Sequence, residues 1–211
     1  MLEKTAYLLG RNDEEPNIDL AKLLSETGDI EGIREIVEGL KNKKVQVAND
    51  CIKVLYEIGE RDPELIAEYV SEFIMLLKSK NNRLVWGSMV ALTQITPLKP
   101  NEVFSKFEDI LSAYKNGSVI TVDNAITVFA ELCRADKKYE IVVFRHIIEH
   151  LKTCRPKEVA QHSERASICV NEGNSKEFID VLLLRKESLT EAQNKRVDKL
   201  IKKIVKNNSE E

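Results

Sequence analysis

The sequence predicts an all-α protein, a right-handed solenoid of antiparallel helix pairs that repeats about every 37 residues. Three observations lead to this prediction: few chain breakers, a helical spacing of apolar residues, and the return of that spacing along the chain. The 211 residues include only 8 Gly and 5 Pro, well below the roughly 7% and 5% of an average protein. Because loop-rich and mainly β chains need more of both residues, helices are expected to fill most of the chain.

The helical spacing is first seen at Ile33, Ile36, Val37 and Leu40, which lie at i, i+3, i+4 and i+7 on one face of a helix. The same spacing returns at each of the next three steps of 37 residues. The later quartets are Val70, Phe73, Ile74, Leu77; Phe107, Ile110, Leu111, Tyr114; and Phe144, Ile147, Ile148, Leu151. Since all sixteen positions are apolar or aromatic, these quartets are the predicted core of the first helix in each unit.

A second helix in each unit shares the period. Its apolar positions are Leu55, Leu92, Phe129, Ala166 and Ile58, Ile95, Leu132, Cys169. A further shared position holds mostly small residues, at Cys51, Ser88, Ala125 and His162. Small side chains at that position would let neighbouring helices approach closely.

The repeat divides the chain into a predicted single helical-repeat domain over residues 1–211. An N-terminal cap at 1–28 is expected to hold helices at 2–9 and 18–26, joined by a charged loop at 11–17. The predicted helix pairs are 29–60, 63–96, 100–135 and 137–171, followed by a degenerate C-terminal cap at 174–206 and a tail at 207–211.

Local signals mark several helix starts. Asp62 before Pro63 and Arg155 before Pro156 are typical of an N-cap followed by proline at the first helical position. Ser188 with Glu191 matches a capping box, which predicts that the last helix begins near residue 189.

Two-helix units of this length with an apolar first-helix quartet resemble the HEAT and armadillo-type α-solenoids, close to the adaptin-like and condensin-like members. The resemblance covers about residues 18–206 and concerns architecture. HEAT units typically carry an Asp in the turn and a Val-Arg pair early in the second helix. The matching stretches here read NNRLVW at 81–86 and NGSV at 116–119, so the wider superfamily describes the chain better. The resemblance implies that second helices line a concave face where partners bind.

The predicted partner-binding residues on the second helices are Asn49, Lys53, Arg83, Trp86, Val90, Asp123 and Thr127. Trp86 is the only tryptophan, and an exposed tryptophan is a common anchor in protein interfaces. The alternative is that Trp86 packs against neighbouring second helices. With the other charged positions of the same stripe, this face carries three positive and six negative charges, the wrong balance for phosphate neutralisation. The other positions are Asp50, Glu57, Glu60, Glu131, Lys157 and Glu164. The leading prediction is therefore a non-enzymatic scaffold or adaptor that binds a protein partner of unknown identity.

Histidine and cysteine residues suggest a metal site only weakly. His146, His150 and Cys154 are spaced by one helical turn each, which can align three ligands on one face. The helix geometry places His146 on the side away from the core quartet, and no fourth ligand is apparent, so a solvated face is favoured and no metal or other cofactor is predicted. His162 is expected to be a buried, hydrogen-bonded histidine.

No catalytic motif is found. Nucleotide-binding glycine loops, a nucleophile elbow, a His-Glu-x-x-His zinc motif and the His-Glu dipeptides of di-iron helical repeats are all absent. A base-excision enzyme would need a basic, aromatic-lined groove, which one tryptophan and an acidic stripe match poorly. We therefore expect that the protein is not an enzyme.

The C-terminal segment is basic. Residues 185–206 carry a net charge of +5, whereas residues 1–184 carry −6. Its candidate residues for an anionic partner are Lys195, Arg196, Lys199, Lys202 and Lys203. One interpretation is a helical cap whose apolar stripe packs on Phe178 and Leu182. The other is a binding element, which keeps a nucleic-acid-binding or DNA-repair-like module as the alternative function.

Compartment signals favour the cytoplasm. The N-terminus lacks the basic and apolar regions of a signal peptide, and no apolar run is long enough to span a bilayer. The four cysteines, at 51, 133, 154 and 169, form no compact disulfide or zinc pattern. The sequence leaves the oligomeric state open.

Overall fold

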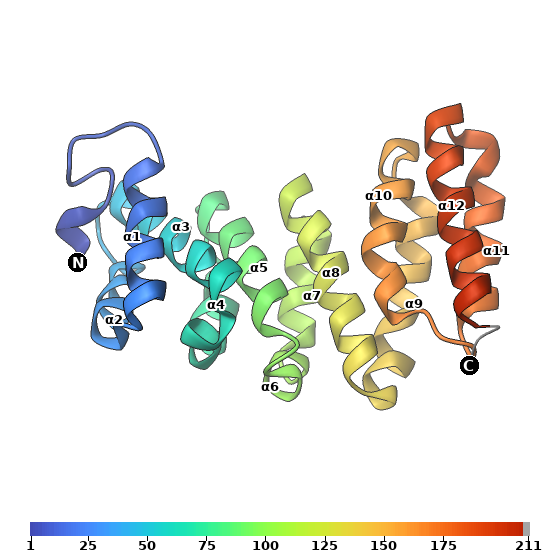
Figure 1. The fold of residues 1–211 in the computed structure, drawn as a ribbon, viewed down its shortest axis with the longest axis horizontal. Helices are drawn as coiled ribbons and strands as arrows, with labels where there is room; N and C mark the ends of the chain where they lie inside the picture. Colours follow the sequence, from blue (N-terminus) through green and yellow to red (C-terminus); the bar gives the residue numbers. More distant parts are fainter. Residues whose placement is uncertain (209–211) are drawn as a thin grey trace. The chain divides into compact units, whose positions relative to one another are not determined.

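The computed structural model describes residues 1–208, and every regular element in that range is a helix (Figure 1). The elements gather into two compact units, Met1–Ala125 and a second that begins at Ile126. The prediction of an all-α solenoid of helix pairs is confirmed. Its right-handed sense and the single domain over residues 1–211 stay predictions.

The helices follow the repeat closely. The first unit contains η1 (Leu2–Lys4), α1 (Glu15–Thr27), α2 (Ile30–Gly39), α3 (Val45–Arg61), η2 (Pro63–Tyr69), α4 (Val70–Leu76), α5 (Asn82–Ile95), α6 (Pro100–Phe104) and α7 (Phe107–Asn116). Helix α8 (Val119–Ala135) contributes to both units. The second unit contains α9 (Lys137–Thr153), α10 (Pro156–Ala166), η3 (Ser167–Cys169), α11 (Ser175–Arg185), η4 (Lys186–Ser188) and α12 (Glu191–Asn207). Each helix pair begins and ends within two residues of the range that the 37-residue period predicts.

The first-helix quartets form the core, as predicted. Fifteen of their sixteen side chains are buried, and Tyr114 is half-buried. The second helix of one pair packs on the second helix of the next, so that α3 lies between α1 and α5 in the first unit (Figure 1). In the second unit α9 packs on α11 and α10 packs on α12. This packing places the polar faces of successive second helices side by side.

Close approach of the second helices depends on small residues. The shared position at Cys51, Ser88, Ala125 and His162 is fully buried in all four helix pairs. Gly87 of α5 faces Ile52 of α3 so closely that a Cβ atom at Gly87 would lie 2.6 Å from Ile52 Cγ1. Any side chain at residue 87 would therefore push α3 and α5 apart.

The N-terminal segment differs from the prediction. The expected helix at 2–9 is only the 3-10 turn η1 followed by turns, and α1 begins at Glu15 rather than at residue 18. The physical reason is competition for backbone donors. The Ala6 N–H donates to the Asn17 side chain at 2.9 Å, and the Tyr7 N–H donates to Asp50 at 2.7 Å. These donors are used in tertiary contacts that a continuous helix would prevent.

The predicted helix starts are partly confirmed. Asp62 caps η2 by accepting a hydrogen bond from Glu64 N–H at 3.2 Å, and α10 begins at Pro156. The predicted box of Ser188 and Glu191 is wrong. The last helix begins two residues later, where the Thr190 hydroxyl accepts from Gln193 N–H and the Gln193 side chain accepts from Thr190 N–H.

Helix α12 closes the second unit. Val197, Leu200 and Ile204 are buried, and the helix packs on both α10 and α11. Phe178 and Leu182 of α11 are also buried, in agreement with a packed cap. Of the predicted tail at 207–211, residues 209–211 lie outside the described residues. None of the described helices combines the length and the apolar character needed to cross a membrane.

Two isoleucines of α9 test the assignment of the core. Ile147 is fully buried in a quartet, whereas Ile141 on the same helix is 72% exposed. Ile147→Ala is expected to lower the free energy of unfolding by about 2–5 kcal/mol, because it removes buried methyl groups and leaves a cavity. Ile141→Ala should change it by less than about 0.5 kcal/mol. Urea unfolding followed by circular dichroism measures both, and equal losses would contradict the assignment.

Candidate functional site

A carboxylate at the N-cap of α1 joins the second helices of the first unit. Glu14 accepts a hydrogen bond from Lys53 Nζ of α3 at 3.2 Å and pairs with the Arg83 guanidinium of α5. Burial alone would raise the pKa of Glu14, but the hydrogen bonds from Arg83 and Lys53 hold it below its usual value. One side chain from the N-terminal segment thus fixes two of the predicted partner-binding residues in place.

Lys53 is held from a second side by a neighbouring turn of α3. Its Nζ lies 2.7 Å from Glu57, which in turn lies 2.9 Å from Arg61. The Lys53 and Glu57 side chains are only 10% and 13% exposed. Although burial opposes both charges, hydrogen bonding to Glu57 raises the pKa of Lys53, and hydrogen bonds from Lys53 and Arg61 lower the pKa of Glu57. The lysine is therefore a paired, nearly buried cation.

Two aromatic rings alternate with these cations. The Tyr56 and Trp86 rings lie 5.8 Å apart, centroid to centroid, at an angle of 46°. Lys53 Nζ lies 4.9 Å from the Tyr56 ring centroid, and the Arg83 guanidinium carbon lies 5.2 Å from that of Trp86. Trp86 is half-buried. It packs against Tyr56 of the neighbouring second helix and remains partly accessible, and its role as an anchor for a partner stays a prediction.

One nitrogen of the Arg83 guanidinium donates no hydrogen bond to the described residues. Its Nε is buried, and among the described residues it has no hydrogen-bond acceptor. A buried guanidinium nitrogen without an acceptor lowers the stability of the protein. We refer to Glu14, Lys53, Tyr56, Arg83 and Trp86 as the α3–α5 cluster.

The remaining predicted partner-binding residues are less closely linked. Asn49 accepts a hydrogen bond from the Asn81 side chain at 2.7 Å at the start of α5. Val90 and Asp123 are half-buried on α5 and α8. Thr127 belongs to the second unit, where its hydroxyl accepts from Arg165 at 2.9 Å. The structure thus gathers Lys53, Arg83 and Trp86 into one cluster.

Sequence reasoning missed Glu14 and Tyr56. Glu14 lies in the N-terminal segment outside the repeat, so no periodic pattern links it to Lys53 or Arg83. Tyr56 is one turn from Lys53 on α3, a spacing that could have indicated a contact between the lysine and the ring.

The basic residues of α12 are partly neutralised within the second unit. Lys195 pairs with Glu191 and Arg196 with Glu164, both at 2.6 Å. Lys199, Lys202 and Lys203 are exposed.

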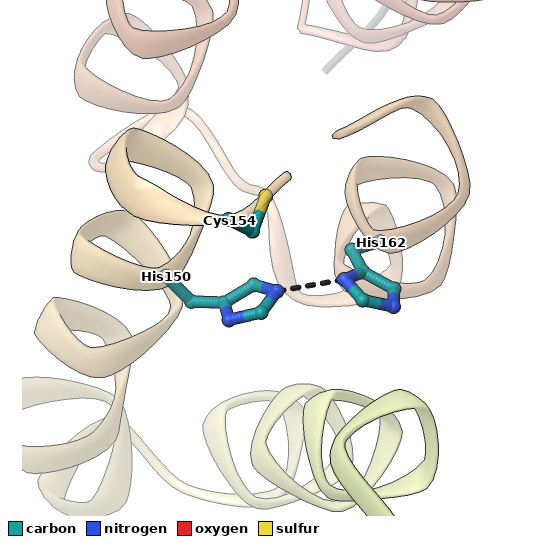
Figure 2. Close-up of side chains that lie close together, drawn as sticks. All are labelled: His150, Cys154 and His162. Atoms are coloured by element: carbon teal, nitrogen blue, oxygen red, sulfur yellow. Dashed lines mark hydrogen bonds between the residues drawn. The ribbon is translucent and has the colours of Figure 1, made fainter. Parts of the chain in front are cut away.

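A second cluster lies where α9 meets α10. His150 Nε2 and His162 Nδ1 are 2.7 Å apart, within hydrogen-bonding distance, and the Cys154 side chain lies beside them (Figure 2). The nearest ligand atoms of the three residues all lie within 4.8 Å of one another. Both histidines are buried, and Cys154 is half-buried.

The solvated face predicted for this histidine helix is therefore wrong at His150. His150 lies on the flank of the α9 core stripe, and α10 covers that flank through His162. The prediction that His162 is buried and hydrogen-bonded is confirmed. His146, the third member of the sequence pattern, lies instead against Phe129, with ring centroids 6.4 Å apart.

Comparison with known proteins identifies the fold. No family model and no curated protein matches the chain. An engineered protein of known structure is similar over 97% of this chain and 96% of its own, with a TM-score of 0.65 and 16% identity. Designed armadillo repeat proteins for modular peptide recognition match 89% of this chain and 91% of theirs, with a TM-score of 0.64 and 11% identity. Another designed armadillo repeat protein matches 97% of this chain and all of its own, with a TM-score of 0.64 and 12% identity.

The fold is thus of the HEAT and armadillo-like helical-repeat type, as the sequence resemblance implies. At these identities the likeness concerns the fold alone. What the chain does must be argued from its own side chains.

Two equally buried glutamates test the Lys53 pairing. Glu57 supports the nearly buried Lys53, whereas Glu131, which is 14% exposed, pairs at 2.7 Å with an Arg134 that is 55% exposed. Glu57→Gln should lower the free energy of unfolding by about 1–3 kcal/mol, because it leaves a desolvated ammonium with less compensation. Glu131→Gln should cost less than about 1 kcal/mol, because water solvates its partner. Urea unfolding at pH 7 measures both.

The ion pair of Lys53 and Glu57 also predicts how stability depends on pH, because the pKa of Glu57 is lowered in the folded protein. A carboxyl group whose pKa is lowered on folding stabilises the protein above its unfolded pKa of about 4.3. That contribution disappears as the pH falls through the lower folded value. The difference in stability between wild type and Glu57→Gln should therefore shrink as the pH is lowered from 7 to about 3. A difference that stays constant would show that the Glu57 charge contributes nothing.

Proposed function

We propose that this chain is a non-enzymatic scaffold that binds a protein partner, and that the α3–α5 cluster is its principal contact surface. The observation that carries the proposal is the half-buried Trp86, whose ring lies 5.8 Å from the Tyr56 ring and 5.2 Å from the guanidinium carbon of Arg83. Both aromatic residues stand on consecutive second helices that pack on each other.

An anchor of this kind binds at low entropic cost. A tryptophan that already packs on one side loses little rotational freedom when a partner covers its other side. Tryptophan, tyrosine and arginine are the residues that most often dominate interface energetics. The cluster combines all three.

The net charge of the α3–α5 cluster indicates the chemistry of the partner. The cluster with Glu57 and Arg61 contains three cations and two carboxylates, a net charge of +1. The Arg83 side chain is 30% exposed. We therefore propose that the partner is a peptide segment that places an apolar side chain on Trp86 and a carbonyl or carboxylate oxygen near Arg83. The similarity to armadillo proteins designed for modular peptide recognition supports a peptide ligand.

The four cysteines are free thiols. Free, mostly buried thiols fit a reducing compartment, and we propose a cytoplasmic location.

Trp86 provides the test of the proposed surface. Peptides selected on the intact protein from a random display library are expected to change the emission of its single tryptophan. Their affinity, measured by the anisotropy of a labelled peptide, should fall by at least about tenfold in Trp86→Ala, since a central anchor is worth about 2 kcal/mol or more. Trp86→Phe should retain part of the affinity. Leu184→Ala is the control, since Leu184 is a large apolar side chain of α11 that is 75% exposed and lies outside the cluster. This variant should bind the peptides as wild type does.

Selected peptides that bind Trp86→Ala and Arg83→Gln as tightly as wild type would remove this surface from consideration. Correctly folded variants, shown by unchanged circular dichroism, make that result decisive.

The nucleic-acid alternative makes a different prediction. Because Lys195 and Arg196 are paired with acidic residues, α12 offers few cations for phosphate. We expect no binding to duplex DNA that persists at about 200 mM salt. Salt-resistant binding that disappears when Lys199, Lys202 and Lys203 are replaced by Gln would favour the nucleic-acid function instead.

A further inference from the structure

The cluster between α9 and α10 brings together ligand types that the proposed scaffold function does not use. The chain has only 3 His and 4 Cys. Two of those histidines and one cysteine place their nearest ligand atoms within 4.8 Å of one another (Figure 2). Burial excludes a solvated role for either histidine.

Backbone hydrogen bonds fix the position of Cys154 next to the two histidines. Cys154 ends α9, and its N–H donates to the His150 carbonyl at 2.8 Å. From α11, Arg185 donates to the carbonyls of Leu151 at 2.5 Å and Cys154 at 2.7 Å. Only Arg155 separates Cys154 from the first residue of α10, so the cysteine and His162 are fixed on two anchored elements.

We propose that His150 Nε2, His162 Nδ1 and Cys154 Sγ bind a Zn²⁺ ion. Zinc–nitrogen bonds of about 2.0–2.1 Å and a zinc–sulfur bond of about 2.3 Å require ligand atoms about 3.3–3.6 Å apart in a tetrahedron. The two ring nitrogens are 2.7 Å apart. Small rotations of the two rings would move these nitrogens apart by the less than one ångström that is required, and a rotation of the Cys154 side chain would bring its Sγ, which lies within 4.8 Å of them, to bonding distance.

The hydrogen-bonded pair marks the position of the ion. In the metal-free protein a proton occupies the line between the two ring nitrogens. On binding, the ring that donates this hydrogen bond gives its proton to solvent and takes one up on its other nitrogen, so that each neutral ring then carries its single proton on the nitrogen that faces away from the ion. The thiol of Cys154 loses its proton to solvent as the Zn–S bond forms. One proton is released for each ion bound.

Zn²⁺ fits this donor set better than the harder cations do. Imidazole and thiolate are ligands of zinc and of copper(I), whereas Mg²⁺ and Ca²⁺ require oxygen. The described residues supply three ligand atoms, so the fourth tetrahedral position is available to water. Cys154 is half-buried, so one of the three ligands remains partly accessible to solvent.

The test uses the intact chain without a histidine tag. Reduced protein titrated with Co²⁺ should develop a thiolate-to-cobalt charge-transfer band and the intense visible bands of tetrahedral cobalt, saturating at one ion per chain. Zn²⁺ should displace the cobalt and raise the melting temperature of the protein, because it binds the native state.

Substitutions identify the ligands. Cys154→Ser should abolish the charge-transfer band, and His150→Asn and His162→Asn should each weaken binding by more than the roughly 10–100-fold seen for loss of an outer-shell partner. His146→Asn is the matched control, since it removes the remaining histidine from the same helix and should leave binding unchanged. Circular dichroism of each metal-free variant separates loss of a ligand from loss of the fold.

Two results would overturn the site. One is a wild-type protein that shows no tetrahedral cobalt spectrum under reducing conditions. The other is a spectrum and stoichiometry that persist unchanged in Cys154→Ser. Because this site lies in the second unit, neither result bears on the peptide-binding surface of the first.

Discussion

The structure depends on one constraint, which is that no helix pair of this chain can bury its apolar stripe by itself. Each first helix presents four large side chains along one face, and they become buried only when other helices cover them. The second helices must then approach one another closely. Gly87 against Ile52 shows how closely α3 and α5 do so.

The polar features follow from that packing. Since α3 lies between α1 and α5, Lys53 is almost removed from water and must be paired, which Glu14 and Glu57 accomplish. The same proximity of α3 and α5 stacks Tyr56 beside Trp86. The contacts of Lys53 and Tyr56 with Arg83 and Trp86 are a consequence of the apolar repeat, because α3 and α5 are second helices that the repeat packs together.

Periodic features of the fold could be predicted from the sequence, and features that depend on single long-range contacts could not. The quartet at Ile33 to Leu40 recurs at a fixed interval, so its burial in every unit follows from the pattern. The period also placed Trp86 and Lys53 on second helices, which is why both were proposed as binding residues. Glu14 lies outside the repeat and meets Arg83 only after the chain has folded, so no local signal reveals it. His150 was misassigned because its own helix leaves it on a flank, and only the packing of α10 against that flank buries it.

Repeat packing holds Trp86 as a preformed, half-buried anchor. Time-resolved fluorescence anisotropy of the intact protein tests it most directly, because Trp86 is the single tryptophan of the chain. The indole should have almost no nanosecond motion of its own and should rotate with the protein, while acrylamide still quenches part of its emission. A large, fast local rotation with the quenching of a free indole would contradict the claim.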